Sequence, residues 1–85
     1  MWASHIPKRV DRELADAPPT VHDHLQETLA QLQHEPRPSG CKKLKGKVQC
    51  WRVRVGAYRI LYDILDRQRT IVILKIGPRK DVYRT

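Results

Sequence analysis

The chain has 85 residues, of which 31% are charged and 40% are hydrophobic, and its formal net charge is +8. This length suits one domain over residues 1–85, because two separate cores would need a longer chain. The composition argues against a disordered polymer, and the lack of a long uncharged apolar run or of a signal-peptide pattern favours a cytoplasmic protein without a membrane span.

The charge is divided unequally along the chain. Residues 1–36 carry a net charge of −3, and residues 37–85 carry +11. A surface that only needs to be soluble mixes its signs, so the second part is expected to meet a polyanion. Nucleic acid is favoured over a membrane surface, because the basic part lacks an amphipathic basic helix.

The N-terminal part predicts a short edge strand at WASHI, followed by a helical hairpin. Pro7 suits the opening turn of a first helix, in which Val10 and Leu14 lie one turn apart. Thr20 is the expected N-cap of a second helix. The apolar stripe of that helix consists of Val21, Leu25, Leu29 and Leu32. The proline-rich segment that follows cannot continue it.

The period then changes from helical to alternating. In CWRVRV, the apolar side chains of Trp51, Val53 and Val55 point one way, and Arg52 and Arg54 point the other. Two further apolar stretches, YRILYDIL and TIVILKI, complete an antiparallel meander. The nearly continuous apolar run of the last strand is typical of a strand that is covered on both sides or central in the sheet. The predicted fold class is α+β, with the helical hairpin packed on one face of a small twisted sheet.

Three arginines are candidates for a phosphate site. Arg52 and Arg54 must share the face that the helices leave uncovered, and Arg59 follows the tight turn opposite them. An outward Arg59 is favoured because burial of an unpaired guanidinium group is costly. The alternative is that these are ordinary exposed strand residues that keep a sheet edge soluble.

The C-terminal segment and the lysine cluster extend this candidate site. Gly77 and Pro78 end the last strand, so Arg79 should lie beside the same sheet, where Tyr83 can stack on a base or present its hydroxyl. A rim of phosphate contacts is predicted at Lys42, Lys43, Lys45, Lys47, Lys80 and Arg84. The lysine cluster has an equally plain alternative as a solvated loop.

No metal or other cofactor is predicted. Cys41 and Cys50 are too few for a structural zinc site, and the four histidines lie far from them in the sequence. A cytoplasmic location favours two free thiols over a disulfide.

Three stretches, KLKG, WRVRVGAYRILYDI and IVILKIGPRKDVYR, together resemble the RelE branch of the RelE/ParE superfamily, the toxins of bacterial and archaeal toxin–antitoxin pairs. The resemblance runs from Leu44 to Arg84. It implies a metal-independent endoribonuclease that cuts mRNA, usually in the ribosomal A site, by attack of a 2′-hydroxyl on the adjacent phosphate. It also implies an acidic, largely helical antitoxin as partner.

The resemblance assigns roles to single residues. The basic strand residues of the family match Arg52 and Arg54, its phosphate-binding arginine matches Arg59, and the arginine after its last strand matches Arg79. Its C-terminal tyrosine matches Tyr83. The best-known member has lysines at the first two positions, so the base that accepts the 2′-proton passes here to the tyrosine or to a water molecule.

Two other hypotheses stay open. A ParE-like toxin of the same fold would act on DNA gyrase and not on RNA. A non-catalytic RNA-binding module would use the same arginines without a base.

Overall fold

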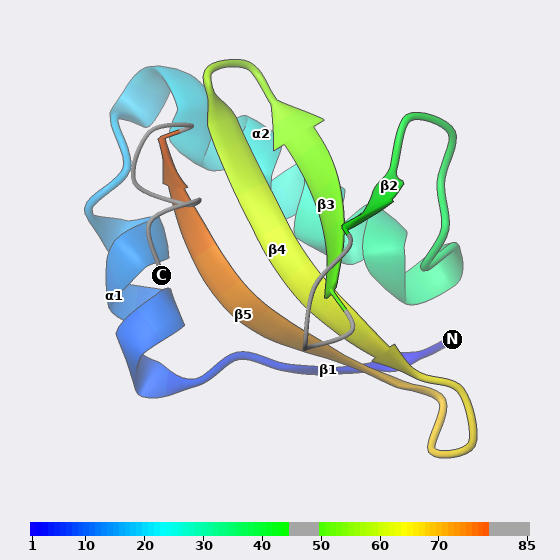
Figure 1. Cartoon of the computed structure of the whole chain (residues 1–85). Helices are drawn as coiled ribbons and strands as arrows, with labels where there is room; N and C mark the ends of the chain where they lie inside the picture. The colour runs from blue at the N-terminus through cyan, green and yellow to red at the C-terminus, as the bar shows by residue number, and fades with distance from the viewer. Residues whose placement is uncertain (45–49, 79–85) are drawn as a thin grey trace.

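The computed structural model describes residues 1–44 and 50–78, and the segments 45–49 and 79–85 lie outside this description (Figure 1). The two helices and five strands of the described part follow the order β1, α1, α2, β2, β3, β4, β5. Their bounds are β1 Ala3–His5, α1 Lys8–Ala15, α2 Pro19–His34, β2 Lys42–Leu44, β3 Cys50–Val55, β4 Tyr58–Leu65 and β5 Thr70–Pro78.

The strands form one sheet in the order β1-β5-β4-β3-β2. Strands β3, β4 and β5 pair antiparallel, which confirms the predicted meander, and β5 lies inside the sheet as expected. The short strand β1 pairs parallel with β5 at one edge, and β2 pairs with β3 at the other. Figure 1 shows β4 and β5 as the long, strongly curved centre of this sheet.

Proline sets the start of both helices. Pro7 is the N-cap of α1, and α2 begins at Pro19 after Pro18 as its cap; neither cap residue makes a side-chain hydrogen bond. The prediction of Thr20 as N-cap was therefore wrong: the proline ring fixes φ near the helical value one residue earlier, so Thr20 already lies within the helix. No helix in residues 1–44 and 50–78 combines the length and the apolar character needed to cross a membrane.

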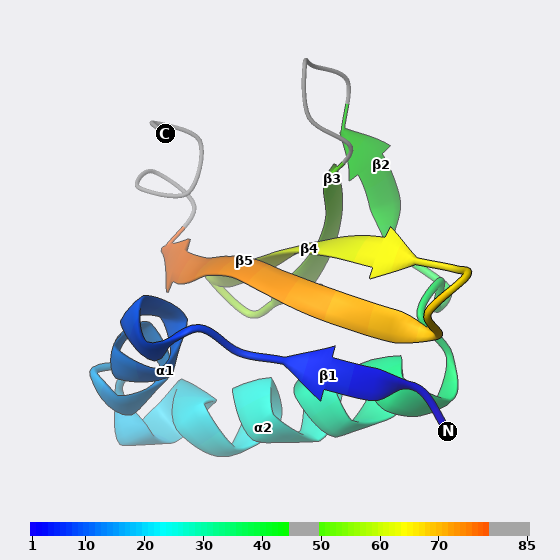
Figure 2. The ribbon, with the colours of Figure 1, turned by 90° about the horizontal axis from the view of Figure 1, so that it is seen from below.

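The core lies between the helices and one face of the sheet. Figure 2 shows α2 running beneath the sheet and α1 at the end of β5. Leu25 and Leu32 of α2 and Ile60 of β4 are fully buried in the same cluster. Burial of each such side chain contributes about 1.5–3 kcal/mol. The α+β class, with a helical hairpin on one sheet face, is confirmed.

Tyr62 fastens the connection after α2 to the sheet. Its side chain is fully buried, and its hydroxyl donates a hydrogen bond of 2.7 Å to the carbonyl oxygen of Pro36. Burial raises the pKa of this phenol far above its ordinary value. One residue further, Arg37 forms two hydrogen bonds with the Asp66 carboxylate, at 3.2 and 3.0 Å, and its guanidinium lies 5.1 Å from the Trp51 ring centroid.

Helix α1 closes the edge of β5 beyond the end of β1. Arg9 donates a 2.7 Å hydrogen bond to the Leu74 carbonyl, and the Glu13 carboxylate accepts one of 3.1 Å from the Ile76 amide. These two residues are four apart, so they lie on the same side of the helix. They satisfy backbone groups that an open sheet edge would leave unpaired.

A candidate anion-binding face on the sheet

The sheet face opposite the helices carries the basic residues of the candidate site. In the register, Arg54 pairs with Arg59, Arg52 pairs with both Leu61 and Lys42, and Leu61 also pairs with Lys75. Since directly paired residues point to the same side of a sheet, these side chains share one surface. We call it the cationic face, and it consists of Lys42, Arg52, Arg54, Arg59, Leu61 and Lys75.

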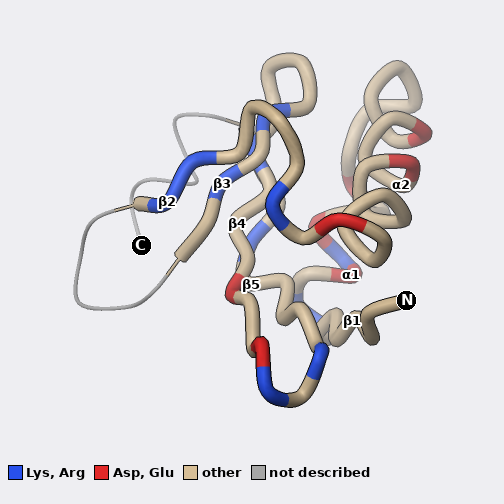
Figure 3. Tube along the Cα trace, turned by 90° about the vertical axis from the view of Figure 1, so that its right-hand side faces the viewer, with Lys and Arg blue, Asp and Glu red and all other residues tan. Residues whose placement is uncertain are grey.

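Figure 3 shows how the charges are distributed over the molecule. Lys and Arg positions follow β2, β3 and β4, whereas Asp and Glu positions are prominent on α1 and α2. Strands β2 and β3 carry basic residues without Asp or Glu, and α2 carries acidic residues without Lys or Arg, whereas α1 mixes both signs. Such a one-sided field attracts a polyanion to the sheet side.

Arg59 lies on the predicted side of the sheet but is not exposed. Only 5% of the Arg59 surface is exposed, and its Nε atom is buried without a hydrogen-bond partner within the described residues. Its one described hydrogen bond runs from Nη1 to the carbonyl of the preceding Tyr58, at 3.2 Å. The predicted side of the sheet is right, but the expectation that this guanidinium would avoid burial was wrong.

The pair Arg54 and Arg59 is electrostatically unusual. Directly opposite residues on adjacent strands bring their Cβ atoms within about 5.5 Å, and like charges in such a pair destabilise the sheet. No carboxylate forms a salt bridge with either residue within residues 1–44 and 50–78. A bound anion would relieve this repulsion, so the pair has the electrostatics of an anion site.

The other members of the cationic face differ in exposure. Arg54 is exposed and Arg52 is half-buried, whereas Leu61 of β4 is only 8% exposed. Leu61 belongs to a different surface from the core cluster, because its strand neighbours Ile60 and Tyr62 point towards the helices. An apolar floor beside guanidinium groups lowers the local dielectric constant, which strengthens their attraction for an anion.

The lysine cluster is divided between the two sheet faces. The loop alternative was wrong for Lys42 and Lys43, which form part of strand β2. Lys42 pairs with Arg52 and lies on the cationic face. Lys43 pairs with Trp51 and points to the other side, where its Nζ lies 5.9 Å from the Trp51 ring centroid. Lys43 therefore lies off the cationic face, because side chains alternate along β2, and its phosphate contact stays a prediction.

Six predicted site residues fall outside the described part of the chain. They are Lys45, Lys47, Arg79, Lys80, Tyr83 and Arg84. Their roles stay predictions. The described part of the site is therefore the arginine and lysine surface of β2 to β5.

Lys75 is a site candidate that the sequence reasoning missed. A strict alternation along β5 would place it inward, on the side of Ile71 and Ile73. A register shift between Leu61 and Tyr62 reverses this, since Tyr62 pairs with Ile73 while Leu61 pairs with Lys75. The signal in the sequence was the charge itself, because a lysine within an apolar strand marks a position that needs an exit to solvent.

The groove beside α2 does not have the chemistry of an anion site. It lies on the helix side of the sheet, and its lining includes Val21, His24, Glu27, Val55 and Tyr58. None of its described lining residues is a lysine or an arginine. The cationic face is therefore the better candidate.

Cys41 and Cys50 are free thiols, both half-buried. Burial raises the pKa of the Cys50 thiol, which makes it a poor nucleophile at neutral pH. Within the described residues, no three His, Cys, Asp or Glu side chains gather as metal ligands would.

Comparison with known proteins identifies the class. The family model described as the ParE toxin of type II toxin–antitoxin systems, parDE, matches residues 4–83. The RelE1 protein of Methanocaldococcus jannaschii is 37% identical over 82 residues, covering 93% of this chain and 91% of the relative. Toxin RelG of Mycobacterium tuberculosis is 34% identical over 74 residues, covering 86% and 85%.

Solved structures agree. The archaeal RelE–RelB complex from Pyrococcus horikoshii OT3 contains a chain with a TM-score of 0.81 at 29% identity, covering 99% of this chain and 98% of that one. The RelBE2 toxin–antitoxin complex of Mycobacterium tuberculosis gives a TM-score of 0.79 at 29% identity, covering 92% and 98%. The chain therefore belongs to the RelE/ParE superfamily of type II toxins, and within it to the RelE-like branch.

Proposed function

We propose that this protein is an endoribonuclease toxin of the cytoplasm that cleaves mRNA, bound in the ribosomal A site, and so inhibits translation. The reaction is attack of a 2′-hydroxyl on the adjacent phosphate, which leaves a cyclic phosphate and a free 5′-hydroxyl. It proceeds without a metal ion. The whole chain, residues 1–85, acts as one domain.

The observation that carries the proposal is the burial of Arg59. Arg59 is 5% exposed, lies opposite Arg54 on the paired strand and has no carboxylate partner in the described residues. Such a buried, unpaired charge destabilises the folded state. An RNA phosphate would neutralise this charge, and guanidinium groups bind phosphate oxygens in a planar, bidentate geometry.

The arginines suit the charge that develops during the reaction. In-line attack produces a dianionic, pentacovalent phosphate, which is more negative than the starting diester. Cations that are already in place on a partly dry surface stabilise this state more than the ground state. Arg52, Arg54 and Arg59 therefore act as electrostatic residues at the reacting phosphate.

Proton transfer needs another group. A guanidinium stays protonated at any ordinary pH, so Arg52 and Arg54 are poor bases. The proposed base or acid is Tyr83, or a water molecule that the arginines hold. Arg79 is proposed to bind the same phosphate from the segment that follows β5.

The natural inhibitor is proposed to be an acidic antitoxin protein. Chains of the same fold occur in RelE–RelB and RelBE2 toxin–antitoxin complexes. A basic sheet face offers such a partner complementary charge. A short acidic segment covering the cationic face would block access of RNA to it.

Primer extension on mRNA after induced expression tests the proposal. The wild type should produce cuts inside translated codons, and Arg59→Met should abolish them while the protein still accumulates. Arg67→Met is the matched control, since Arg67 is exposed in the β4–β5 turn away from the cationic face. Tyr83→Phe examines proton transfer: an unchanged cleavage rate excludes the hydroxyl from it.

Other outcomes identify the alternative functions. Loss of DNA supercoiling with intact transcripts would replace the proposal with a gyrase-directed, ParE-like toxin. Tight RNA binding without any cut would indicate a non-catalytic module of the same fold. Growth arrest by Arg59→Met at the wild-type level would refute the site as described.

A further inference from the structure

A row of side chains crosses the cationic face at right angles to the strands. Paired positions link Lys42 to Arg52, Arg52 to Leu61, and Leu61 to Lys75. Neighbouring strands lie about 4.8 Å apart, so the backbone positions of the two terminal lysines are about 14 Å apart. This distance exceeds several times the rise per phosphate along the axis of a duplex, about 3.4 Å for one strand. The row can therefore contact more than one phosphate.

Glu13 of α1 restrains Lys75 from the edge of the sheet. The Lys75 Nζ atom lies 3.9 Å from Glu13 Oε2, and the two side chains are 21% and 23% exposed. The other carboxylate oxygen of Glu13 accepts the Ile76 amide hydrogen, so the backbone of β5 fixes the carboxylate in position. The lysine therefore loses part of the conformational freedom that an exposed lysine keeps.

The ion pair alone is a weak reason for a lysine at this position. A separation of 3.9 Å is at the outer limit of a salt bridge, and in a mostly buried pair the cost of desolvating both charges offsets much of their attraction. The ammonium group has three donors, and Glu13 is its only ion-pair partner within residues 1–44 and 50–78. The register shift in β5 turns this lysine out of the core side and onto the surface that carries the arginines.

We propose that Lys75 is a further RNA-contacting residue, which binds a phosphate beside the reacting one on the β5 side of the cationic face. Glu13 positions it from α1. This inference rests on the proposed function and extends it, because it gives the RNA a direction across the strands, from Lys42 towards Lys75. Lys75 supplies binding and orientation, and it does not transfer a proton.

The test is the salt dependence of RNA binding. A single-stranded oligoribonucleotide with 2′-O-methyl groups, which cannot be cut, is bound by the full chain and followed by fluorescence anisotropy. Each phosphate contact on a single strand contributes about 0.7 to the slope of log K against log salt. We expect Lys75→Met to reduce the slope by about 0.7 and Lys75→Arg to retain it.

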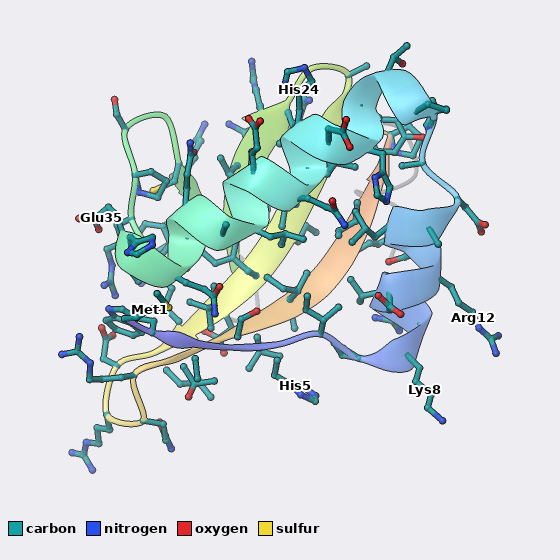
Figure 4. All side chains as sticks on the ribbon, turned by 180° about the vertical axis from the view of Figure 1, so that it is seen from behind. Met1, His5, Lys8, Arg12, His24 and Glu35 are labelled. Carbon is teal, nitrogen blue, oxygen red and sulfur yellow. The ribbon has the colours of Figure 1, made fainter. Side chains whose placement is uncertain are left out.

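Lys8→Met is the matched control, because it removes the same charge from the far side of the molecule. Figure 4 shows Lys8 projecting from α1 away from the sheet. Its slope should equal that of the wild type. Glu13→Gln keeps an acceptor for the Ile76 amide, and it should preserve the slope because Lys75 keeps its charge.

The outcomes separate the two proposals. If wild-type binding is salt-dependent and Lys75→Met does not change the slope, Lys75 is not an RNA contact, and the proposed function stands. If Lys75→Met and Glu13→Gln lower the melting temperature equally and neither changes the slope, the pair is purely structural. If the wild type shows no salt-dependent binding of RNA, the proposed function fails, and the role of Lys75 fails with it.

Discussion

The two faces of strands β3 and β4 differ sharply, although alternating residues of the same two strands form both. On the helix side, Val53, Ile60 and Tyr62 are 9%, 0% and 0% exposed and form part of the core. On the other side, Arg54 is exposed, and Arg59 is buried without a carboxylate partner in the described chain. The helix-side face stabilises the folded state. The cationic face destabilises it, and the same unpaired charges give that face its affinity for an anion.

The contrast is greatest at neighbouring positions. Ile60 and Arg59 are adjacent in β4, and both are buried, but they point to opposite faces. Burial of an aliphatic side chain is favourable, whereas burial of a guanidinium without a partner is unfavourable. Substitutions at these two positions should therefore change stability in opposite directions.

Truncation of Ile60 should have the largest effect on the fold. Ile60→Ala removes a fully buried side chain between β4 and the helices. It should lower the free energy of unfolding by about 2–5 kcal/mol, a large part of the about 5–15 kcal/mol typical of a domain. Urea denaturation measures this, with Arg54→Ala as the exposed-face control. A loss below about 1 kcal/mol would show that the helix-side face is not the principal core.

Substitution of Arg59 should separate function from stability. Arg59→Met should reduce RNA cleavage by about 100- to 1000-fold, the effect of removing one group that stabilises a developing charge. The same change should raise the free energy of unfolding by about 1 kcal/mol or more, because it replaces a buried unpaired cation with an apolar side chain. A single-turnover cleavage assay and urea denaturation measure the two quantities. A variant that is both inactive and less stable would show that Arg59 is a structural residue.

The sequence predicted the faces well where the chain alternates strictly. The order of apolar and basic residues in β3 placed Arg52 and Arg54 opposite the core, since a strand has a period of two. The burial of Arg59 was not predictable in this way, because a period of two gives the face that a side chain joins and not how deeply it is covered. The position of Lys75 was missed for a different reason: a single irregularity between Leu61 and Tyr62 reverses which face it joins.

The start of α2 and the strand β2 illustrate the same limit. Local rules predicted Thr20 as a cap, but the preceding prolines already impose the helical φ. Strand β2 has only three residues, and it exists through its pairing with β3. A segment that short carries too little periodicity to be distinguished from a loop.

Removal of the Tyr62 hydroxyl should have an intermediate effect. Tyr62→Phe leaves the ring in the core but deprives the buried Pro36 carbonyl of its hydrogen bond, which should cost about 1–2 kcal/mol. Tyr58→Phe is the matched control, since the Tyr58 hydroxyl makes no hydrogen bond in residues 1–44 and 50–78.

The same substitution should change the response to alkali. Because burial raises the pKa of Tyr62 in the folded state, the unfolded chain loses this proton first as the pH rises through about 10. Wild-type stability should therefore fall with increasing pH in this range more steeply than that of Tyr62→Phe. Equal slopes would mean that the phenol is not held in the core.

The smallest effect concerns the ion pair that links the connection after α2 to the β4–β5 turn. The hydrogen bond from Arg37 holds the pKa of Asp66 below its ordinary value. A lowered pKa means that the pair stabilises the fold at neutral pH and loses this contribution as the pH falls below about 3.9. The wild type should thus exceed Asp66→Asn slightly in melting temperature at pH 7, and the two should converge in acid.

Salt provides an independent check of the Arg37–Asp66 pair. Both side chains are largely exposed, at 43% and 61%, so added salt should reduce the difference at pH 7. Asp23→Asn removes another exposed aspartate that no arginine contacts in the described structure, and its melting curve should follow the wild type at every salt concentration. A difference between wild type and Asp66→Asn that survives high salt would indicate that the two Arg37–Asp66 hydrogen bonds, at 3.2 and 3.0 Å, contribute more to stability than the attraction between the two charges.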